Sequence, residues 1–338
     1  MGYPIDQKLV IAVASSALFD LTKCDRVFRE QELEAYRAYQ RDHENEVLPR
    51  GVAFPLIRRI LALNSPEQKQ HPVEVVLLSR NDPDTGLRVF KSIAHYKLDI
   101  TRAAFVNGGD PFRYLAAFNT CLFLSANSAD VSSALKKNVA AGRVLPTQFS
   151  DDSADNELRI AFDFDGVLAD DSAEAVFKQE QLSGFFRSET QNAEIPMPVG
   201  PLHRFSLEIA RLHKLLQETA SKSGATTGQI RTAIVTARNA PAHQRVVTSL
   251  RTWGIQVDEV FFLGGIKKAR VLEIFRPHIF FDDQLTHVEG AAPTVPCAHV
   301  PFGIANEPPL ETATGCLTPK KPSASVILDP NYEKLITA

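Results

Sequence analysis

Residues 159–171, with the sequence RIAFDFDGVLADD, decide how this chain is interpreted. Mostly apolar residues lead to Phe162, as is typical of a buried strand, and Asp163 and Asp165 follow at once. Aspartate is depleted in strands, and a buried carboxylate is costly without a partner, so the two acids indicate a strand that ends at a site. A similar stretch near the start, VIAVASSALFD at residues 10–20, has no acid at the matching places.

The two stretches belong to an internal repeat. A shift of 149 residues aligns residues 11–12 with 160–161, residues 27–36 with 176–185, and Gly51 with Gly200. A shift of 157 residues then aligns Ser79 with Thr236, Arg88 with Arg245, Ser92 with Ser249, residues 105–115 with 262–272, and residues 125–126 with 282–283. Any two α/β segments share some likeness, but matches in one order with a single change of offset favour common descent. The chain is therefore interpreted as two tandem copies of one unit, about 8–130 and about 157–290.

Each copy alternates short apolar strands with charged helical stretches. In the second copy the predicted strands are LRIAFDF, RTAIVTA, EVFFLG and HIFFDD. Continuous apolar strands between helices predict an α/β fold of tandem Rossmann-like units, with parallel sheets flanked by helices. The interval at about 172–228 is too long for a simple crossover and predicts a small helical cap. The predicted domains are 1–150, 151–305 and a Pro/Thr-rich tail at 306–338.

The composition argues against several classes of protein. The chain has 338 residues, 44% of them hydrophobic, and a formal net charge of −3 with no long run of one sign. This balance argues against nucleic acid or an anionic membrane as the main partner, because both bind basic patches. No apolar run approaches the roughly 20 residues that a membrane span needs, and the N-terminus lacks the order of a signal peptide.

Cysteine usage bears on the compartment. The four cysteines, Cys24, Cys121, Cys297 and Cys316, are scattered without a CxxC pair. This spacing predicts reduced thiols and a cytoplasmic protein. The sequence leaves the number of chains in the assembly open, so a homo-oligomer is one alternative.

In the second copy, polar residues stand where the predicted strands end. They are Asp163 and Asp165, Thr236, the pair Lys267 and Lys268, and Asp282 and Asp283. Because the carboxyl ends of parallel strands meet at one edge of a sheet, these side chains are expected to converge. Carboxylates gathered in one place repel one another unless a cation neutralises them, and Mg²⁺ is the usual ion in phosphate chemistry. We therefore expect the four aspartates to hold Mg²⁺.

The ordered motifs of the second copy resemble those of the haloacid dehalogenase-like phosphohydrolases. DFDGV resembles the first motif, Thr236 the second, a lysine of GGIKKARVL the third, and FFDDQ the acidic fourth. The resemblance implies that Asp163 is a nucleophile that forms an aspartyl-phosphate and that Asp165 is the acid/base. It also implies that Thr236 hydrogen-bonds the phosphate. Either Lys267 or Lys268 fits the third motif, and Lys268 is preferred.

Four further positions are predicted to contact the substrate: Gly166, Ala237, Arg238 and Phe177. Gly166 lets the backbone turn sharply and leaves room for a phosphate, and the backbone N–H of Ala237 is placed to hold the transferred group. Arg238 either contacts phosphate or ribose or pairs with a carboxylate. Phe177, with Phe185 and Phe186, is a candidate to stack on a base, although aromatic residues at helical spacing are more often core.

Nearly the whole chain, about 8–305, is also similar to the cytosolic 5′-nucleotidases of type I. The segments that carry this resemblance include RIAFDFDGVLADDSAE, IVTARNAPAHQRVVTSLRTWGI and FRPHIFFDDQLTHVEGA in the second copy and LFLSANSADV in the first. The resemblance implies an enzyme that hydrolyses AMP-like nucleoside 5′-monophosphates to nucleoside and phosphate with Mg²⁺. DFDGVLA stands where relatives are expected to have DGDAVLF, which puts the base preference in doubt. The alternatives are a phosphatase of another small phosphomonoester and a catalytically silent, nucleotide-binding regulatory protein.

The first copy lacks the residues for this chemistry. Ala14, Ser16, Pro111, Ser125 and Ala126 stand where the second copy has the nucleophile, the acid/base, the lysine and the acidic pair. The repeat at 1–150 is therefore predicted to be degenerate and non-catalytic. It is either a packing partner that shapes the mouth of the site or a site for a nucleotide effector.

Overall fold

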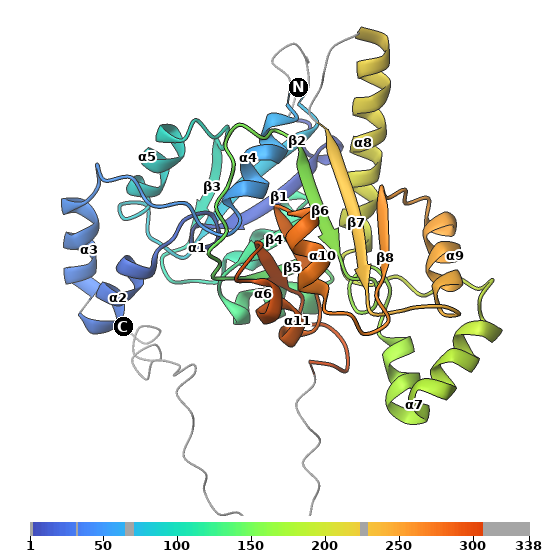
Figure 1. Ribbon diagram of the computed structural model, residues 1–338. Helices are drawn as coiled ribbons and strands as arrows, with labels where there is room; N and C mark the ends of the chain where they lie inside the picture. The colour runs from blue at the N-terminus through green and yellow to red at the C-terminus, as the bar shows by residue number, and fades with distance from the viewer. Residues whose placement is uncertain (1–2, 32, 65–70, 224–228, 307–338) are drawn as a thin grey trace, which may run out of the picture. The chain divides into compact units, whose positions relative to one another are not determined.

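Ten strands form one sheet that runs through both copies of the repeat (Figure 1). The structure is a computed structural model that describes residues 3–31, 33–64, 71–223 and 229–306. The predicted tail beyond Asn306 lies outside the described residues. Helices flank the sheet, and its strand pairs are parallel except for one. The predicted α/β fold, with parallel strands flanked by helices, is confirmed.

The strand order is the same in both halves. The first half contains β1 (Leu9–Ala14), β2 (Val73–Ser79), β3 (Arg102–Phe105), β4 (Leu122–Ser125) and β5 (Ala141–Leu145). The second contains β6 (Leu158–Phe162), β7 (Ile230–Thr236), β8 (Glu259–Phe262), β9 (Ile279–Asp282) and β10 (Cys297–His299). Across the sheet the order is β3-β2-β1-β4-β5-β10-β9-β6-β7-β8, so each half runs third, second, first, fourth, fifth from its outer edge. Two copies of one unit give this arrangement.

The fifth strands join the halves and were not predicted. β5 and β10 pair antiparallel, and each is parallel to the fourth strand of its own half. β5 includes a glycine and an arginine, and β10 has only three residues, so neither shows an apolar run. The predicted boundary at 150/151 falls between β5 and β6, and the division into separate domains stays a prediction.

The helices connect the strands. The described helices of the first half are α1 (Ser15–Leu18), α2 (Thr22–Glu30), α3 (Leu33–Asp42), α4 (Phe54–Ala62), α5 (Leu87–His95) and α6 (Ser128–Lys136). Those of the second half are α7 (Ser172–Gln191), α8 (His203–Ser223), α9 (His243–Trp253), α10 (Lys268–Phe275) and α11 (Leu285–Ala291). Short 3-10 turns lie at Ile5–Gln7, Pro111–Tyr114 and Ala116–Phe118. None of the described helices has the length and apolar character that a membrane crossing requires.

Apolar side chains cover both faces of the sheet. Along β1, Ile11 and Val13 belong to a cluster that extends over one face through both halves, and Val10 and Ala12 belong to a separate cluster on the other face. This alternation follows from the two-residue period of a strand. Continuous burial therefore explains why the strands read as unbroken apolar runs rather than as alternating ones.

Part of the interval predicted as a cap, about 172–228, packs on the sheet, and the existence of a cap stays a prediction. α8 carries an apolar stripe, and its Phe205 ring lies 6.1 Å from that of Phe162 in β6 and 6.0 Å from that of Phe281 in β9. α8 is thus a core helix on the sheet rather than part of a cap, because its apolar stripe is buried there. Figure 1 shows α7 beyond the carboxyl end of β7, and residues 224–228 lie outside the described part of the chain.

A buried ion pair connects α4 to the segment between the halves. Arg59 is fully buried, and its Nη1 lies 2.6 Å from Asp151 Oδ1. Its Nη2 donates a hydrogen bond of 2.8 Å to the carbonyl oxygen of Asp152. The neighbouring Arg58 Nε lies 3.5 Å from Asp151 Oδ2. The connecting segment is therefore attached to the first half by buried charge.

The described cysteines fit the predicted reduced state. Cys24, Cys121 and Cys297 are free and buried. Cys316 lies outside the described residues. Burial in apolar surroundings raises the pKa of the Cys121 thiol to about 12, so this side chain acts as a small apolar group rather than as a nucleophile.

Candidate functional site

A lysine lies between two aspartates at the carboxyl ends of β6 and β9. Asp163 directly follows β6, Asp282 is the last residue of β9, and these two strands are parallel neighbours. Lys268, the first residue of α10, places its Nζ 2.6 Å from Asp163 Oδ2 and 2.7 Å from Asp282 Oδ2. All three side chains are buried. The predicted convergence of these strand-end residues is therefore present in the structure.

Asp283 lies beside this group under a close backbone turn. Gly166 has φ of +69°, and a Cβ there would come within 2.5 Å of the Asp283 carboxyl carbon. Only glycine tolerates both this backbone conformation and this approach, which explains its place after DFD. Burial, followed by the charges of Asp163 and Asp282, raises the pKa of Asp283 to about 9.

Burial and neighbouring charges also shift the pKa values of Asp163, Asp282 and Lys268. Burial raises the pKa of Asp163 to about 7; Lys268 opposes this rise, and Asp282 adds to it. Burial also acts to raise the pKa of Asp282, but Lys268 and His287 outweigh it and lower the value. Burial acts to lower the pKa of Lys268, but its two aspartate neighbours raise it, so the ammonium stays charged.

This donor set fits a divalent cation. Three buried carboxylates, Asp163, Asp282 and Asp283, lie near one ammonium, and burial together with the neighbouring carboxylate charges raises the pKa values of Asp163 and Asp283. Asp163, Asp282 and His287 offer ligand atoms that all lie within 4.8 Å of one another. A dication held there would relieve the repulsion. Asp165 and Asp283 are outside this set of three, so their role as ligands stays a prediction.

Thr236 ends β7, which pairs with β6, so its side chain belongs to the same edge of the sheet. It is buried, and its Oγ1 accepts a hydrogen bond of 3.2 Å from the backbone N–H of Arg238. Ala237, between them, is exposed. The roles of Thr236 and Ala237 in holding a phosphate stay predictions.

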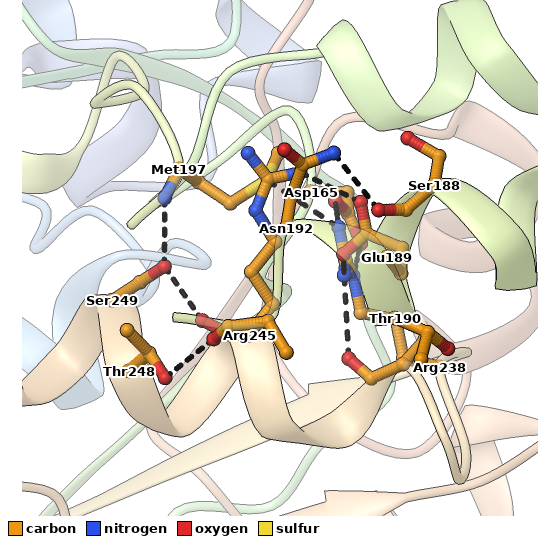
Figure 2. Close-up of polar contacts among 12 residues, drawn as sticks. Asp165, Ser188, Glu189, Thr190, Asn192, Met197, Arg238, Arg245, Thr248 and Ser249 are labelled. Carbon is orange, nitrogen blue, oxygen red and sulfur yellow. Dashed lines mark hydrogen bonds and ion pairs between the residues drawn. The ribbon is translucent and has the colours of Figure 1, made fainter. Parts of the chain in front are cut away.

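Arg238 pairs with carboxylates, which is one of the two alternatives that the sequence left open. Its Nε and Nη2 each donate a hydrogen bond of 2.7 Å to the Asp165 carboxylate, and its Nη1 pairs with Glu189 of α7 (Figure 2). Burial acts to lower the pKa of Arg238, but Asp165 and Glu189 raise it, so the guanidinium stays charged. A contact between Arg238 and a substrate stays a prediction.

The three phenylalanines of α7 differ in their surroundings. Phe185 packs against the core, and the Arg238 guanidinium lies 5.4 Å from its ring centroid. Phe177 is 39% exposed, and its ring meets that of Phe185 edge-on at 6.3 Å. Phe185 is therefore largely a packing residue, and Phe177 remains the candidate to stack on a base.

Two residues of this region were missed by the sequence analysis. His287, on α11, places its Nδ1 3.3 Å from Asp282 Oδ1. The sequence signal that could have found it is its position five residues after Asp282, at the start of the helix that follows β9. In the sequence, Glu189 is one of many charged residues in a helical stretch. The available signal was that its counterpart in the first copy is a neutral residue.

A cavity of about 340 Å³ lies elsewhere, beside β3 of the first half. Phe105, Arg113 and Tyr114 are among the residues that line it, and none of the predicted site residues does. Chemistry requires reactive groups that converge, so we place the site at the carboxylate cluster rather than at this cavity.

Comparisons with known proteins bear on the family of the chain. A family model described as 5′-nucleotidase matches residues 1–307. Human cytosolic 5′-nucleotidase 1B is 35% identical over 289 residues, which cover 84% of this chain and 47% of the human protein. The chain thus spans about half the length of this curated relative. No solved structure matches the chain.

Proposed function

This chain belongs to the 5′-nucleotidase family, and from that premise we propose that it hydrolyses AMP-like nucleoside 5′-monophosphates to nucleoside and phosphate. It is then a phosphoric monoester hydrolase. The observation that carries the proposal is the placement of Lys268 between Asp163 and Asp282 at the ends of adjacent parallel strands. The human relative is named as cytosolic, and we extend a cytoplasmic location to this chain as part of the proposal.

The first step is an in-line attack by Asp163. One of its carboxylate oxygens bonds to phosphorus while the bond from phosphorus to the ribose 5′-oxygen breaks, which gives an aspartyl-phosphate. Lys268 neutralises charge on the phosphoryl oxygens, and the hydroxyl of Thr236 with the N–H of Ala237 holds them. The resemblance of DFDGV to the phosphohydrolase motif supports this role for Asp163.

Asp165 moves the protons in both steps. It gives a proton to the leaving ribose oxygen, so the nucleoside departs as a neutral alcohol. It then accepts a proton from the water that attacks phosphorus, and the Asp163 carboxylate is released together with inorganic phosphate. Its place two residues after the nucleophile, beyond the strand end, puts both aspartates in the same turn.

We take the cation to be Mg²⁺, with Asp163 and Asp282 as ligands beside His287. When bound, it would supply positive charge against the phosphoryl oxygens. The oxygen donors suit Mg²⁺, although a histidine nitrogen is a more usual ligand of transition metals. A test of several cations is therefore part of the experiment below.

The experiment is phosphate release from a panel of nucleoside 5′-monophosphates and sugar phosphates, with Mg²⁺, with Mn²⁺ and with chelator. We expect turnover of nucleotides that requires a divalent cation and is lost when a chelator removes it. Turnover of sugar phosphates alone would keep the chemistry but replace the substrate. Absence of turnover on every compound would overturn the proposal in favour of a silent nucleotide-binding protein.

The two neighbouring lysines provide a matched pair of variants. Lys268→Met is expected to lower kcat for phosphate release by roughly 10²- to 10³-fold, because the ammonium that faces the transferred phosphoryl group is lost. Lys267 is exposed, and Lys267→Met is expected to change kcat less than about threefold, as surface substitutions usually do. Initial rates with a nucleoside monophosphate compare the two. Equal losses in both variants would remove the third-motif role from Lys268.

A further inference from the structure

Two arginines and two carboxylates form one charge-balanced group (Figure 2). Glu189 comes from α7, Arg238 follows β7, Arg245 lies on α9, and Asp165 follows β6. The Glu189 side chain is 1% exposed. One of its carboxylate oxygens pairs with Arg238, and the other lies 2.8 Å from Arg245 Nη1. Arg238 in turn holds both oxygens of Asp165. Glu189 is therefore linked to the proposed acid/base through a single guanidinium.

The geometry of a guanidinium makes this link directional. Its five N–H donors lie in one rigid plane, so an arginine fixed at one edge presents its other edge in a set orientation. Glu189 fixes the Nη1 edge of Arg238, and the Nε–Nη2 edge then meets Asp165 in a bidentate pair. Because Glu189 is buried and paired at both oxygens, it has little freedom to release Arg238.

The first half has a similar corner with a neutral side chain at the position of Glu189. The repeat shift of 149 places Gln40 at the position of Glu189, and the shift of 157 places Asn81 at that of Arg238. Arg88, the counterpart of Arg245, donates to Gln40 Oε1 at 3.4 Å. A buried neutral amide thus fills the position in the half that lacks the catalytic residues.

Two hydrogen bonds to the backbone are shared by this corner in both halves. Arg88 Nε donates to the Glu46 carbonyl oxygen, and Arg245 Nε donates to that of Ile195, in both cases at 2.9 Å. Ser92 Oγ accepts from the backbone N–H of Leu48 at 3.0 Å. Ser249 Oγ accepts from that of Met197 at 2.9 Å. Arg88 pairs with a carboxylate from another position, that of Glu46 at 3.7 Å. The fold of the corner therefore does not need a carboxylate at the position of Glu189, and the half that has one there is the half with the proposed site.

We propose that Glu189 is a positioning residue, which acts through Arg238 to orient the Asp165 carboxylate toward the leaving group. The inference rests on the proposed function and deepens it. It also assigns α7 a part in the reaction, since the helix supplies the residue that orients the acid/base. Glu189 touches no reacting atom in this account.

The expected effect is a loss of turnover without a loss of fold. Glu189→Gln copies the residue that the first half holds at this place, so the variant is expected to fold. Its kcat for a nucleoside 5′-monophosphate is expected to fall by roughly 10- to 100-fold, as for other residues that orient a reacting group, with KM within about threefold. Glu180→Gln, in the part of α7 before its break at Gln181, replaces an exposed residue that pairs with Arg187, and it is the control.

A double-mutant cycle with Asp165→Asn gives a readout that a purely structural role would not produce. If Glu189 acts through Asp165, Glu189→Gln lowers kcat in the wild type but changes it less than about threefold in the Asp165→Asn background. Equal losses in both backgrounds would overturn the inference. A second substrate, p-nitrophenyl phosphate, releases a stable anion that needs little help from an acid. Its turnover is expected to be nearly insensitive to Glu189→Gln.

The two proposals fail in different ways. Wild-type protein that releases no phosphate from any nucleotide overturns the proposed function, and the positioning role falls with it. Wild-type turnover combined with equal losses in the cycle overturns the positioning role alone. If Glu189→Gln does not fold, the same cycle is measured with Glu189→Asp, which keeps the charge but withdraws it by one methylene, and equal losses would again overturn the inference.

Discussion

Asp163→Asn is expected to reduce phosphate release by about 10⁴-fold or more, because the amide is not a competent nucleophile toward phosphorus. The fold is expected to survive the change. Asparagine has the same shape and keeps the Oδ1 that accepts a hydrogen bond of 2.7 Å from the backbone N–H of Phe164. It also removes a buried carboxylate whose pKa burial raises to about 7. Initial rates of phosphate release and thermal melting measure the two effects.

Asp170→Asn is the matched control for this variant. Asp170 lies in the same segment, and its Oδ1 accepts hydrogen bonds from the N–H and hydroxyl of Ser172, which an asparagine would keep. Its activity is expected to stay within about threefold of the wild type. Full activity of Asp163→Asn would rule out the covalent mechanism, and an equal loss in Asp170→Asn would point to loop geometry instead.

Arg59→Met is expected to lower the free energy of unfolding by roughly 3–5 kcal/mol, the usual cost of breaking a buried ion pair on one side. Arg59 is fully buried, and the change leaves the Asp151 carboxylate, itself 6% exposed, with Arg58 at 3.5 Å as its remaining ion-pair partner among the described residues. The segment between the halves would also lose the hydrogen bond from Arg59 to Asp152. Equilibrium unfolding in urea, followed by circular dichroism, measures the loss.

Two further variants separate charge from packing. Arg58→Met removes a partly exposed partner of the same carboxylate and is expected to cost clearly less. In the double variant Arg59→Met/Asp151→Leu, no charge is left unpaired, so much of the lost stability is expected to return. A loss below about 1 kcal/mol for Arg59→Met would contradict the assignment, because a pair at the surface contributes no more than that.

The two halves of the chain share one strand order but differ in the side chains at their strand ends. The first half keeps the strand order and the corner at Arg88, but Ser125 ends β4 where Asp282 ends β9. Its contribution to the structure is half of the sheet and, through Arg59, the attachment of the connecting segment. The charged residues that we propose to react lie at the strand ends of the second half.

Local pattern was enough to predict the elements that carry the site. The predicted segment RTAIVTA covers all of β7 except its first residue, Ile230, and HIFFDD contains β9, because a strand buried on both faces is rich in apolar side chains. Asp163, Thr236 and Asp282 were placed correctly at strand ends for the same reason: the apolar run stops where the strand leaves the core. The repeat was readable because equivalent positions kept their order along the chain.

The local pattern could not predict contacts between parts of the chain that are distant in sequence. The sequence does not distinguish Lys267 from Lys268. Lys268 is buried because it begins α10, where its side chain reaches Asp282 at the end of β9. The sequence alone suggested that α8 belongs to a cap. The structure shows instead that its apolar stripe packs on Phe162 and Phe281. The pairing of β5 with β10 and the link from Glu189 to Asp165 are likewise tertiary. The apolar pattern of a segment shows by itself that the segment is buried. The partner of a charged residue is determined only when the folded chain brings two segments together.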